Sequence, residues 1–165
     1  MRDMLGREEL ISVEKALELL LKSTPFKTPV EISLPIEEAY GMILSRDAIS
    51  PEDLPGFSRS TVDGFAVNSS DTFGATETLP SYLAVKAEIL MGEEANDRIE
   101  KGAVAKIATG GMLPRGTDAV VMLEHTQQID ENMVEVLKPV APGENVIQAG
   151  EDAQRGEHIL KTGHD

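Results

Sequence analysis

The pattern of apolar and polar positions predicts one helix near the N-terminus and mostly strands after it. Between Ser12 and Lys22 apolar residues recur at helical spacing, with Ser12 as a suitable N-cap and Glu14 in the first turn. Pro25 ends this helix, because proline cannot continue the helical hydrogen-bond pattern. The leucines of the helix form a stripe. Such a stripe is typical of a core face, and a dimer face is the alternative.

Short elements are predicted between this helix and residue 50. Residues 30–34 alternate between apolar and polar positions in the manner of a strand. Pro35 opens a short helical piece that Gly41 closes, and residues 42–49 are predicted to be extended.

From residue 51 onward the pattern is that of an all-β block. The predicted strands begin at Phe65 and then cover residues 82–91, 103–108, 119–123 and 129–137, the last range being a hairpin. Residues 83, 85, 87 and 89 are expected on one face of their strand. Stretches rich in proline and glycine, at residues 50–56 and 139–143, border this block. The predicted fold is therefore mixed α+β and mostly β, with residues 51–140 inserted into a discontinuous host domain of residues 1–50 and 141–165.

Composition narrows the classes of partner. The chain has 165 residues, of which 41% are hydrophobic and 4% aromatic, so its core is expected to be aliphatic. Its net charge of −14 opposes binding to nucleic acid and to anionic membranes, and an anionic ligand would need local donors. The absence of cysteine excludes disulfides and thiolate metal sites and fits a cytoplasmic protein. Neither a signal peptide nor a membrane-spanning run is predicted.

Residues 55–67, P-G-F-S-R-S-T-V-D-G-F-A-V, combine turn formers, hydroxyl groups and a single acid. Asp63 beside Gly64 can be exposed at little cost, and loops that present hydroxyls and a carboxylate often form binding or catalytic edges. Asp-Gly between apolar residues is also the commonest short hairpin signal. On this stretch alone, a plain turn is the better interpretation.

Two later stretches have the same character. Thr109-Gly110-Gly111 can free backbone N–H groups for an anion-binding concavity, although a plain connection between strands is the simpler alternative. Glu151-Asp152 can hold Mg²⁺ or act as acid and base, and the alternative is a solvated turn. The three histidines have no ligand spacing, so no metal ligand is assigned.

Taken together and in this order, the stretches resemble the molybdopterin molybdenumtransferase family, which includes bacterial MoeA proteins and the E domain of gephyrin. The resemblance covers nearly the whole chain. It is carried by S-V-E-K-A-L-E-L-L-L, E-A-Y-G-M-I-L-S-R-D, D-L-P-G-F-S-R-S-T-V-D-G-F-A-V, I-A-T-G-G-M-L-P-R-G-T-D-A-V-V, M-L-E-H-T and G-E-N-V-I-Q-A-G-E-D.

The resemblance implies an enzyme that inserts molybdate into adenylylated molybdopterin, with Mg²⁺ as cofactor. Family members are elongated homodimers of four-part subunits, and the second part is barrel-like. Their cleft lies between the third part of one subunit and the first two parts of the other. This chain matches only the first two parts. We therefore expect an N-terminal fragment that supplies one wall of the cleft and is inactive alone.

The resemblance also implies site residues. Asp63, Thr109 and Asp152 match functional residues of the family and are the catalytic candidates. Weaker candidates for binding the substrate are Ser60, Gly64, Gly110, Gly111, Glu124 and Glu151. The chain departs from the family pattern at Ile147-Gln148-Ala149, where many relatives carry an arginine. It departs again at Gly111, where alanine is common and where glycine is expected to loosen the turn.

An alternative of another class is a complete, non-catalytic module that dimerises or binds an anion together with another polypeptide. A further alternative is that the three motif loops are purely structural turns.

Overall fold

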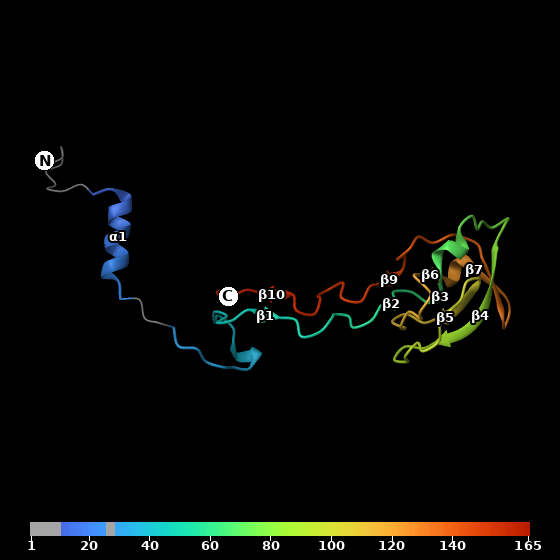
Figure 1. The fold of residues 1–165 in the computed structure, drawn as a ribbon, viewed down its shortest axis with the longest axis horizontal. Helices are drawn as coiled ribbons and strands as arrows, with labels where there is room; N and C mark the ends of the chain where they lie inside the picture. The colour runs from blue at the N-terminus through green and yellow to red at the C-terminus, as the bar shows by residue number, and fades with distance from the viewer. Residues whose placement is uncertain (1–10, 26–28) are drawn as a thin grey trace. The chain divides into compact units, whose positions relative to one another are not determined.

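The computed structural model describes residues 11–25 and 29–165 of the chain. Residues 1–10, which carry the prediction that no signal peptide is present, lie outside this part. The chain divides into two compact units, Met1–Met42 and Ile43–Asp165 (Figure 1). The assignment of residues 51–140 to an inserted domain stays a prediction.

The first unit contains the predicted helix. Helix α1 spans Val13–Ser23, and the hydroxyl of Ser12 accepts a hydrogen bond from the N–H of Lys15 at 3.2 Å. This geometry confirms both the helix and its N-cap. No residue of α1 is buried, so its leucine stripe is exposed.

The short elements of the first unit are confirmed in part. The 3₁₀ helix η1, Ile36–Glu38, follows Pro35, and Gly41 has the positive φ of 77° expected where a helical piece closes. The predicted strand at residues 30–34 is wrong. Among the described residues no segment forms a β-ladder with it, and an alternating pattern makes a strand only when a neighbour supplies the hydrogen bonds.

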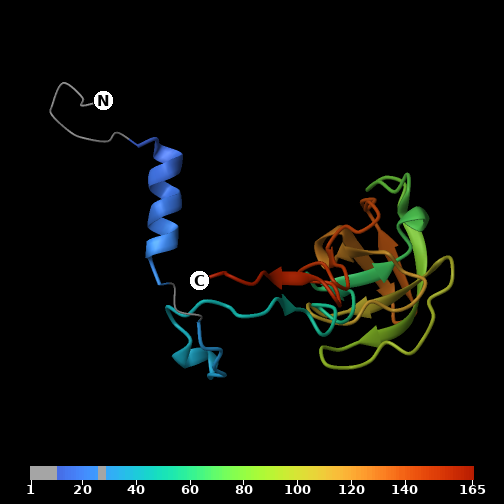
Figure 2. The same ribbon diagram turned by 60° about the vertical axis from the view of Figure 1, so that its left-hand side comes forward.

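Two antiparallel segments form a ribbon at the start and end of the second unit. Strand β1 (Ala48–Ile49) pairs with β10 (His158–Leu160), and β2 (Arg59–Ser60) pairs with β9 (Val146–Ile147). An isolated bridge between Leu54 and Ala153 connects the two ladders. The segments run side by side in both views (Figures 1 and 2). Of the predicted extended segment 42–49, only the last two residues form a strand, and Leu44 is joined by backbone hydrogen bonds to Gly163 and His164.

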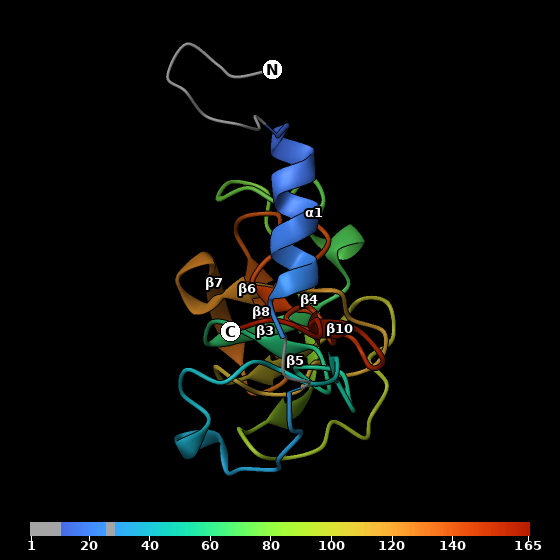
Figure 3. The ribbon, with the colours of Figure 1, turned by 90° about the vertical axis from the view of Figure 1, so that its left-hand side faces the viewer.

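The main body of the second unit is a six-stranded sheet (Figure 3). In spatial order its strands are β6 (Ala119–Met122), β3 (Gly64–Val67), β5 (Ala103–Ile107), β4 (Ser81–Ile89), β8 (Met133–Val136) and β7 (Thr126–Asp130). Only β4 and β5 are parallel. Two 3₁₀ helices accompany the sheet, η2 (Ser69–Thr72) and η3 (Leu123–His125). Strands β6 and β7 form the two opposite edges of the sheet but follow each other in the chain. The sheet between them curls into a half-barrel. The prediction of a mixed, mostly β fold is confirmed.

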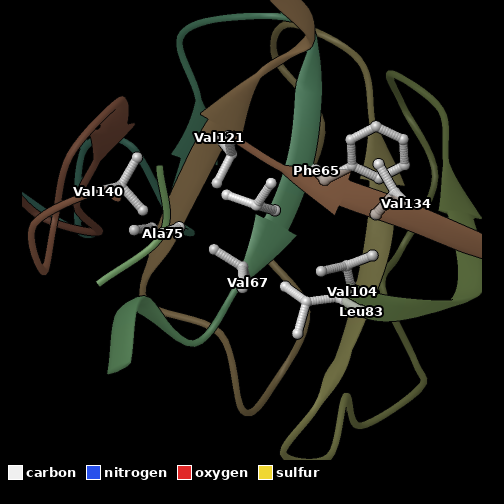
Figure 4. Close-up of a cluster of buried hydrophobic side chains, with 10 residues drawn as sticks. Phe65, Val67, Ala75, Leu83, Val104, Val121, Val134 and Val140 are labelled. Carbon is white, nitrogen blue, oxygen red and sulfur yellow. The ribbon is translucent and has the colours of Figure 1, made fainter. Parts of the chain in front are cut away.

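The core is aliphatic, as its composition predicts, and lies on both faces of the sheet. One cluster contains Phe65 and Val67 of β3 (Figure 4). Alternate residues of the same strands pack into a second cluster. Strand β4 contributes Leu83 to the first cluster and Ile89 to the second. The prediction that these two residues share a face is therefore wrong. An irregularity in the β4–β5 register between residues 85 and 87 changes the face.

Candidate functional site

Asp63 and Thr109 meet at one end of the sheet. The Oδ1 atom of Asp63 accepts hydrogen bonds from the backbone N–H of Thr109 at 2.7 Å and from its hydroxyl at 2.9 Å. Strands β3 and β5 are antiparallel, with Gly64 opposite Ile107. The residue before β3 therefore lies beside the residues that follow β5. Two of the three catalytic candidates are brought together across 46 positions of the chain.

These bonds fix the charge state of Asp63. The backbone N–H of Thr109, and then its hydroxyl, hold the pKa of the Asp63 carboxyl below its ordinary value. The carboxylate is therefore ionised at neutral pH. No described residue donates a hydrogen bond to its second oxygen, Oδ2. The arrangement is an oriented, exposed carboxylate with one oxygen open to a ligand or to water.

Gly64 allows the backbones of β3 and β6 to lie close together at this end of the sheet. A Cβ atom at Gly64 would lie 2.0 Å from the carbonyl oxygen of Val121, which no real contact permits. The N–H of Leu123 donates to the carbonyl oxygen of Asp63 at 3.2 Å, so β6 borders the same corner. Asp63-Gly64 thus does not form a two-residue hairpin. Gly64 is a strand residue whose small size allows two backbones to approach.

The Thr109-Gly110-Gly111 turn uses its own backbone donors. The N–H of Gly110 donates to the carbonyl of Ser60 at 2.8 Å, and that of Gly111 donates to the carbonyl of Ala108 at 2.9 Å. The N–H of Thr109 bonds to Asp63, so none of the three amides is free for an anion, which agrees with the simpler alternative of a plain connection between strands. At Gly111 a Cβ atom would lie 2.8 Å from Cγ1 of Ile107, so glycine here fits a tight turn rather than a loose one.

Ser60 acts within the protein. Its side chain is buried, and its hydroxyl donates to the carbonyl of Val62 at 2.5 Å and accepts from the N–H of Val62 at 3.2 Å. Both roles hold the loop that leads to Asp63, so the hydroxyl shapes the edge without facing a ligand.

A shallow pocket of about 150 Å³ adjoins Asp63. It is lined by Asp63, Gly64, Glu88, Ile89, Leu90, Lys106, Ile107, Ala108 and Leu123. Lys106 and Glu88 form an ion pair of 2.9 Å in its wall. Glu124 is exposed on η3 directly after Leu123, so this weaker candidate borders the pocket region.

The paired acids belong to the ribbon. The N–H of Asp152 donates to the carbonyl of Leu54 at 2.9 Å, and the Glu151 carboxylate accepts from the N–H of Gln148 at 2.8 Å. Across residues 11–25 and 29–165 no hydrogen bond joins either acid to Asp63 or Thr109. Asp152 is exposed and Glu151 closes its own turn, so the structure does not place them in the Asp63 cluster.

The described residues do not form a metal site by themselves. Within that part of the chain no group of three or more histidine, cysteine, aspartate or glutamate side chains is placed to hold an ion. Asp63 offers one open oxygen, whereas Mg²⁺ in proteins takes octahedral oxygen coordination completed by waters and substrate phosphates. The residues present therefore do not fit a resident Mg²⁺ ion.

Two polar side chains, Arg59 and Asp47, were not predicted as functional candidates from the sequence. Arg59 is half-buried on β2, and its Nε is the one buried side-chain nitrogen or oxygen without a hydrogen-bond partner among the described residues. The sequence signal for it is a lone arginine between two serines in an acidic chain. Asp47 accepts hydrogen bonds from the N–H and hydroxyl of Thr162, both at 2.8 Å, and contacts Nδ1 of His158 at 2.8 Å. No local sequence pattern predicts these partners of Asp47, because they lie more than 100 positions away in the chain.

Comparison with known proteins decides the family. The family model of the MoeA N-terminal region, domains I and II, matches residues 11–165. The chain belongs to this family. A putative molybdopterin biosynthesis protein of Methanocaldococcus jannaschii is 39% identical over 155 residues, which cover 94% of this chain and 35% of the relative. The molybdopterin molybdenumtransferase of Haemophilus influenzae is 30% identical over 154 residues, covering 93% of this chain and 37% of the relative.

The fold agrees with that of a solved MoeA family structure. The crystal structure of the molybdopterin biosynthesis MoeA protein of Pyrococcus horikoshii has a TM-score of 0.76 and 36% identity, covering 93% of this chain and 40% of that one. The chain thus spans little more than a third of the length of these MoeA relatives. In the described part of the chain, no helix is both long and apolar enough to cross a membrane.

Proposed function

We propose that this chain forms the first two parts of a cytoplasmic molybdopterin molybdenumtransferase, and that the Asp63 end of the sheet faces the substrate. The reaction is the insertion of molybdate into adenylylated molybdopterin. The observation that supports this most is the Asp63–Thr109 pair, a fixed, ionised carboxylate with one open oxygen beside a small pocket. The family names of the relatives supply the reaction, and the pair supplies a group that can take part in it.

The roles within the pair follow from its geometry. Thr109 is a positioning residue, because both of its donors are bound to Oδ1 and hold the carboxylate in one orientation. Asp63 presents Oδ2, which can accept a proton or orient a water molecule for hydrolysis of the adenylate bond of the substrate. Mg²⁺, which supplies charge neutralisation at phosphate groups, belongs with the substrate and with residues beyond this chain. Asp152, on the ribbon, belongs to another part of the same cleft.

The cleft is completed by a second subunit and by further parts of the enzyme. This chain covers 35–37% of the relatives named above, and the acids in its described part do not form a metal site. We therefore propose a homodimer of longer subunits, in which the 165-residue chain alone does not insert molybdenum. Molybdenum insertion by the purified 165-residue chain would contradict this part of the proposal.

The test of the site uses the full-length enzyme and an assay of molybdenum insertion. Asp63→Asn keeps the size of the side chain but removes the charge, and insertion is expected to fall by about 100-fold or more. Thr109→Val should lower kcat and leave the apparent affinity for substrate little changed, and Thr109→Ser should restore most of the rate. Unchanged insertion by Asp63→Asn, at unchanged melting temperature, would refute a site role for Asp63.

The exposed leucine stripe of α1 favours a second candidate, a non-catalytic dimerisation module. On that account, Leu17→Ala with Leu20→Ala would dissociate the protein, and Asp63→Asn would leave every activity of the full-length protein intact. On the transferase account, Asp63→Asn is the damaging change.

A further inference from the structure

Arg59 is attached to the turn that positions Thr109. The residues before and after it bond to residues 111–113 at the end of that turn. The N–H of Leu113 donates to the carbonyl of Ser58 at 2.9 Å, and the N–H of Ser60 donates to the carbonyl of Gly111 at 3.0 Å. A bridge also joins Arg59 to Met112. The arginine and the Asp63–Thr109 pair are therefore held by one continuous turn.

Among residues 11–25 and 29–165, the guanidinium of Arg59 has no hydrogen-bond or ion-pair partner. Its Nε is buried without a hydrogen bond, and it has no ion pair with a carboxylate among the described residues. A buried donor without a partner is costly, more so when it belongs to a charged group. The chain carries 29 acidic residues against 15 basic ones, so a carboxylate partner was available in abundance. A cation left unpaired under these conditions indicates a ligand that supplies the acceptor.

The chemistry of that ligand follows from the surroundings. With a net charge of −14, the chain repels anions at long range, so an anionic substrate must be captured by local donors. The amides of the Thr109-Gly110-Gly111 turn are already bonded within the protein. Arg59 pairs through its backbone with Met112, directly after this turn, and its Nε is a donor without a partner among the described residues. The planar fork of a guanidinium matches the oxygen spacing of tetrahedral oxyanions.

The opposite strand carries no cation at this place. Arg59 lies directly across from Ile147 in the antiparallel β2–β9 pair, and the next residue along is the neutral Gln148. Directly opposed residues have Cβ atoms roughly 5 Å apart and share one face of a ladder. An arginine at position 59 or at position 147 can therefore serve the same spot.

We propose that Arg59 binds a tetrahedral oxyanion of the substrate through its guanidinium group. The proposal rests on the proposed function and names the anion contact of that site. Molybdate and the phosphate of the adenylate share the required chemistry, and the two arms of the test distinguish them.

The first measurement is an NMR titration of the full-length enzyme that follows the Nε–H signals of the arginines. Sodium molybdate is added in one arm and inorganic pyrophosphate in the other. The Arg59 signal is expected to shift and saturate in at least one arm, and the arm that saturates at lower concentration identifies the source. If the Arg59 signal stays unchanged in both arms, the proposal is overturned.

Three variants sharpen this result. Arg59→Met should weaken anion binding by about tenfold or more, as expected for loss of a charge-assisted hydrogen bond. Arg98→Met is the matched control, because Arg98 is exposed and paired with Glu100 at 3.2 Å. It should bind as the wild type does. The exchange Arg59→Ile with Ile147→Arg should recover binding. Equal binding by Arg59→Met and the wild type, or loss of binding in Arg98→Met alone, would contradict the proposal.

Thermal stability separates a ligand contact from a structural one. Without added anion, Arg59→Met should melt at the same temperature as the wild type or higher, because an unpaired buried donor is removed. Added anion should raise the melting temperature of the wild type and not that of the variant. A variant that melts lower without anion would make Arg59 a structural residue. Since neither readout uses molybdenum insertion, this inference can fail while the proposed function stands, and the reverse also holds.

Discussion

The sheet end and the ribbon contain the same local arrangement around two different aspartates. Asp63 accepts from the N–H and hydroxyl of Thr109 at 2.7 and 2.9 Å, and Asp47 accepts from the N–H and hydroxyl of Thr162, both at 2.8 Å. In both cases the threonine N–H, followed by its hydroxyl, lowers the pKa of the aspartate. In their threonine partners and in the direction of the pKa shift, the two carboxylates are alike.

The second carboxylate oxygen distinguishes them. Oδ2 of Asp47 contacts Nδ1 of His158 at 2.8 Å, so both of its oxygens are used to join the two segments of the ribbon. Oδ2 of Asp63 receives no hydrogen bond from the described residues and lies beside a pocket. A lowered carboxyl pKa therefore accompanies a structural contact at Asp47 and a candidate functional site at Asp63. The unused oxygen, rather than the pKa, is the functional signal.

The largest expected effect comes from the glycines of the two regions. Gly64→Ala should destabilise the chain by about 3 kcal/mol or more, because the added Cβ meets the Val121 carbonyl at 2.0 Å. Gly156→Ala, on the ribbon, has φ of +85° and open space around it, and should cost about 1 kcal/mol. Urea unfolding followed by circular dichroism measures both. Equal costs would show that the sheet end is no more constrained than the ribbon.

A smaller effect is expected on the carboxyl pKa values, measured by NMR titration. Thr109→Val removes one of two donors to Asp63, so the pKa of that carboxyl should rise towards its ordinary value but stay below it. Thr162→Val should move the pKa of Asp47 less, because the contact with His158 remains. A larger rise at Asp47 would mean that the histidine does not stabilise the carboxylate.

The smallest effect is the loss of stability in acid. For both aspartates the pKa in the folded state lies below that of the unfolded chain, which is about 4. Their contribution to stability is complete above pH 4 and declines as the pH falls through the folded pKa. Melting temperatures measured from pH 6 down to pH 2 should therefore fall less in Asp47→Asn than in the wild type. A steeper fall in Asp47→Asn would reverse the assigned sign.

The sequence predicted most elements of the fold, because the apolar residues of β3, β5 and β6 are buried by their neighbours as their pattern requires. It failed at residues 30–34, which have no ladder partner among the described residues, and along β4, where a register irregularity divides Leu83 from Ile89. Both the pairing of a strand and its register depend on residues that are distant in the sequence. Asp63 and Thr109 were identified by resemblance, and their contact follows from the β3–β5 register, which the sequence does not specify.

The hydrogen-bond partners of the Thr109-Gly110-Gly111 turn could not be predicted either, because they are also distant in the sequence. The Thr109-Gly110-Gly111 pattern indicates a tight bend, but whether its amides face a ligand depends on a partner strand nearly 50 positions away. Ser60 supplies that partner and closes the turn. Among the described residues the Nε of Arg59 has no hydrogen-bond partner, which only the three-dimensional structure reveals.

The most direct test is the rate of molybdenum insertion by full-length Asp63→Asn compared with that of full-length Asp47→Asn. Both changes remove one charge from a carboxylate held by a threonine in the same way, so they differ only in what the second oxygen does. We predict that Asp63→Asn inserts molybdenum about 100-fold more slowly than Asp47→Asn, with both proteins folded. Equal rates would contradict the claim that the open oxygen of Asp63 belongs to the active site.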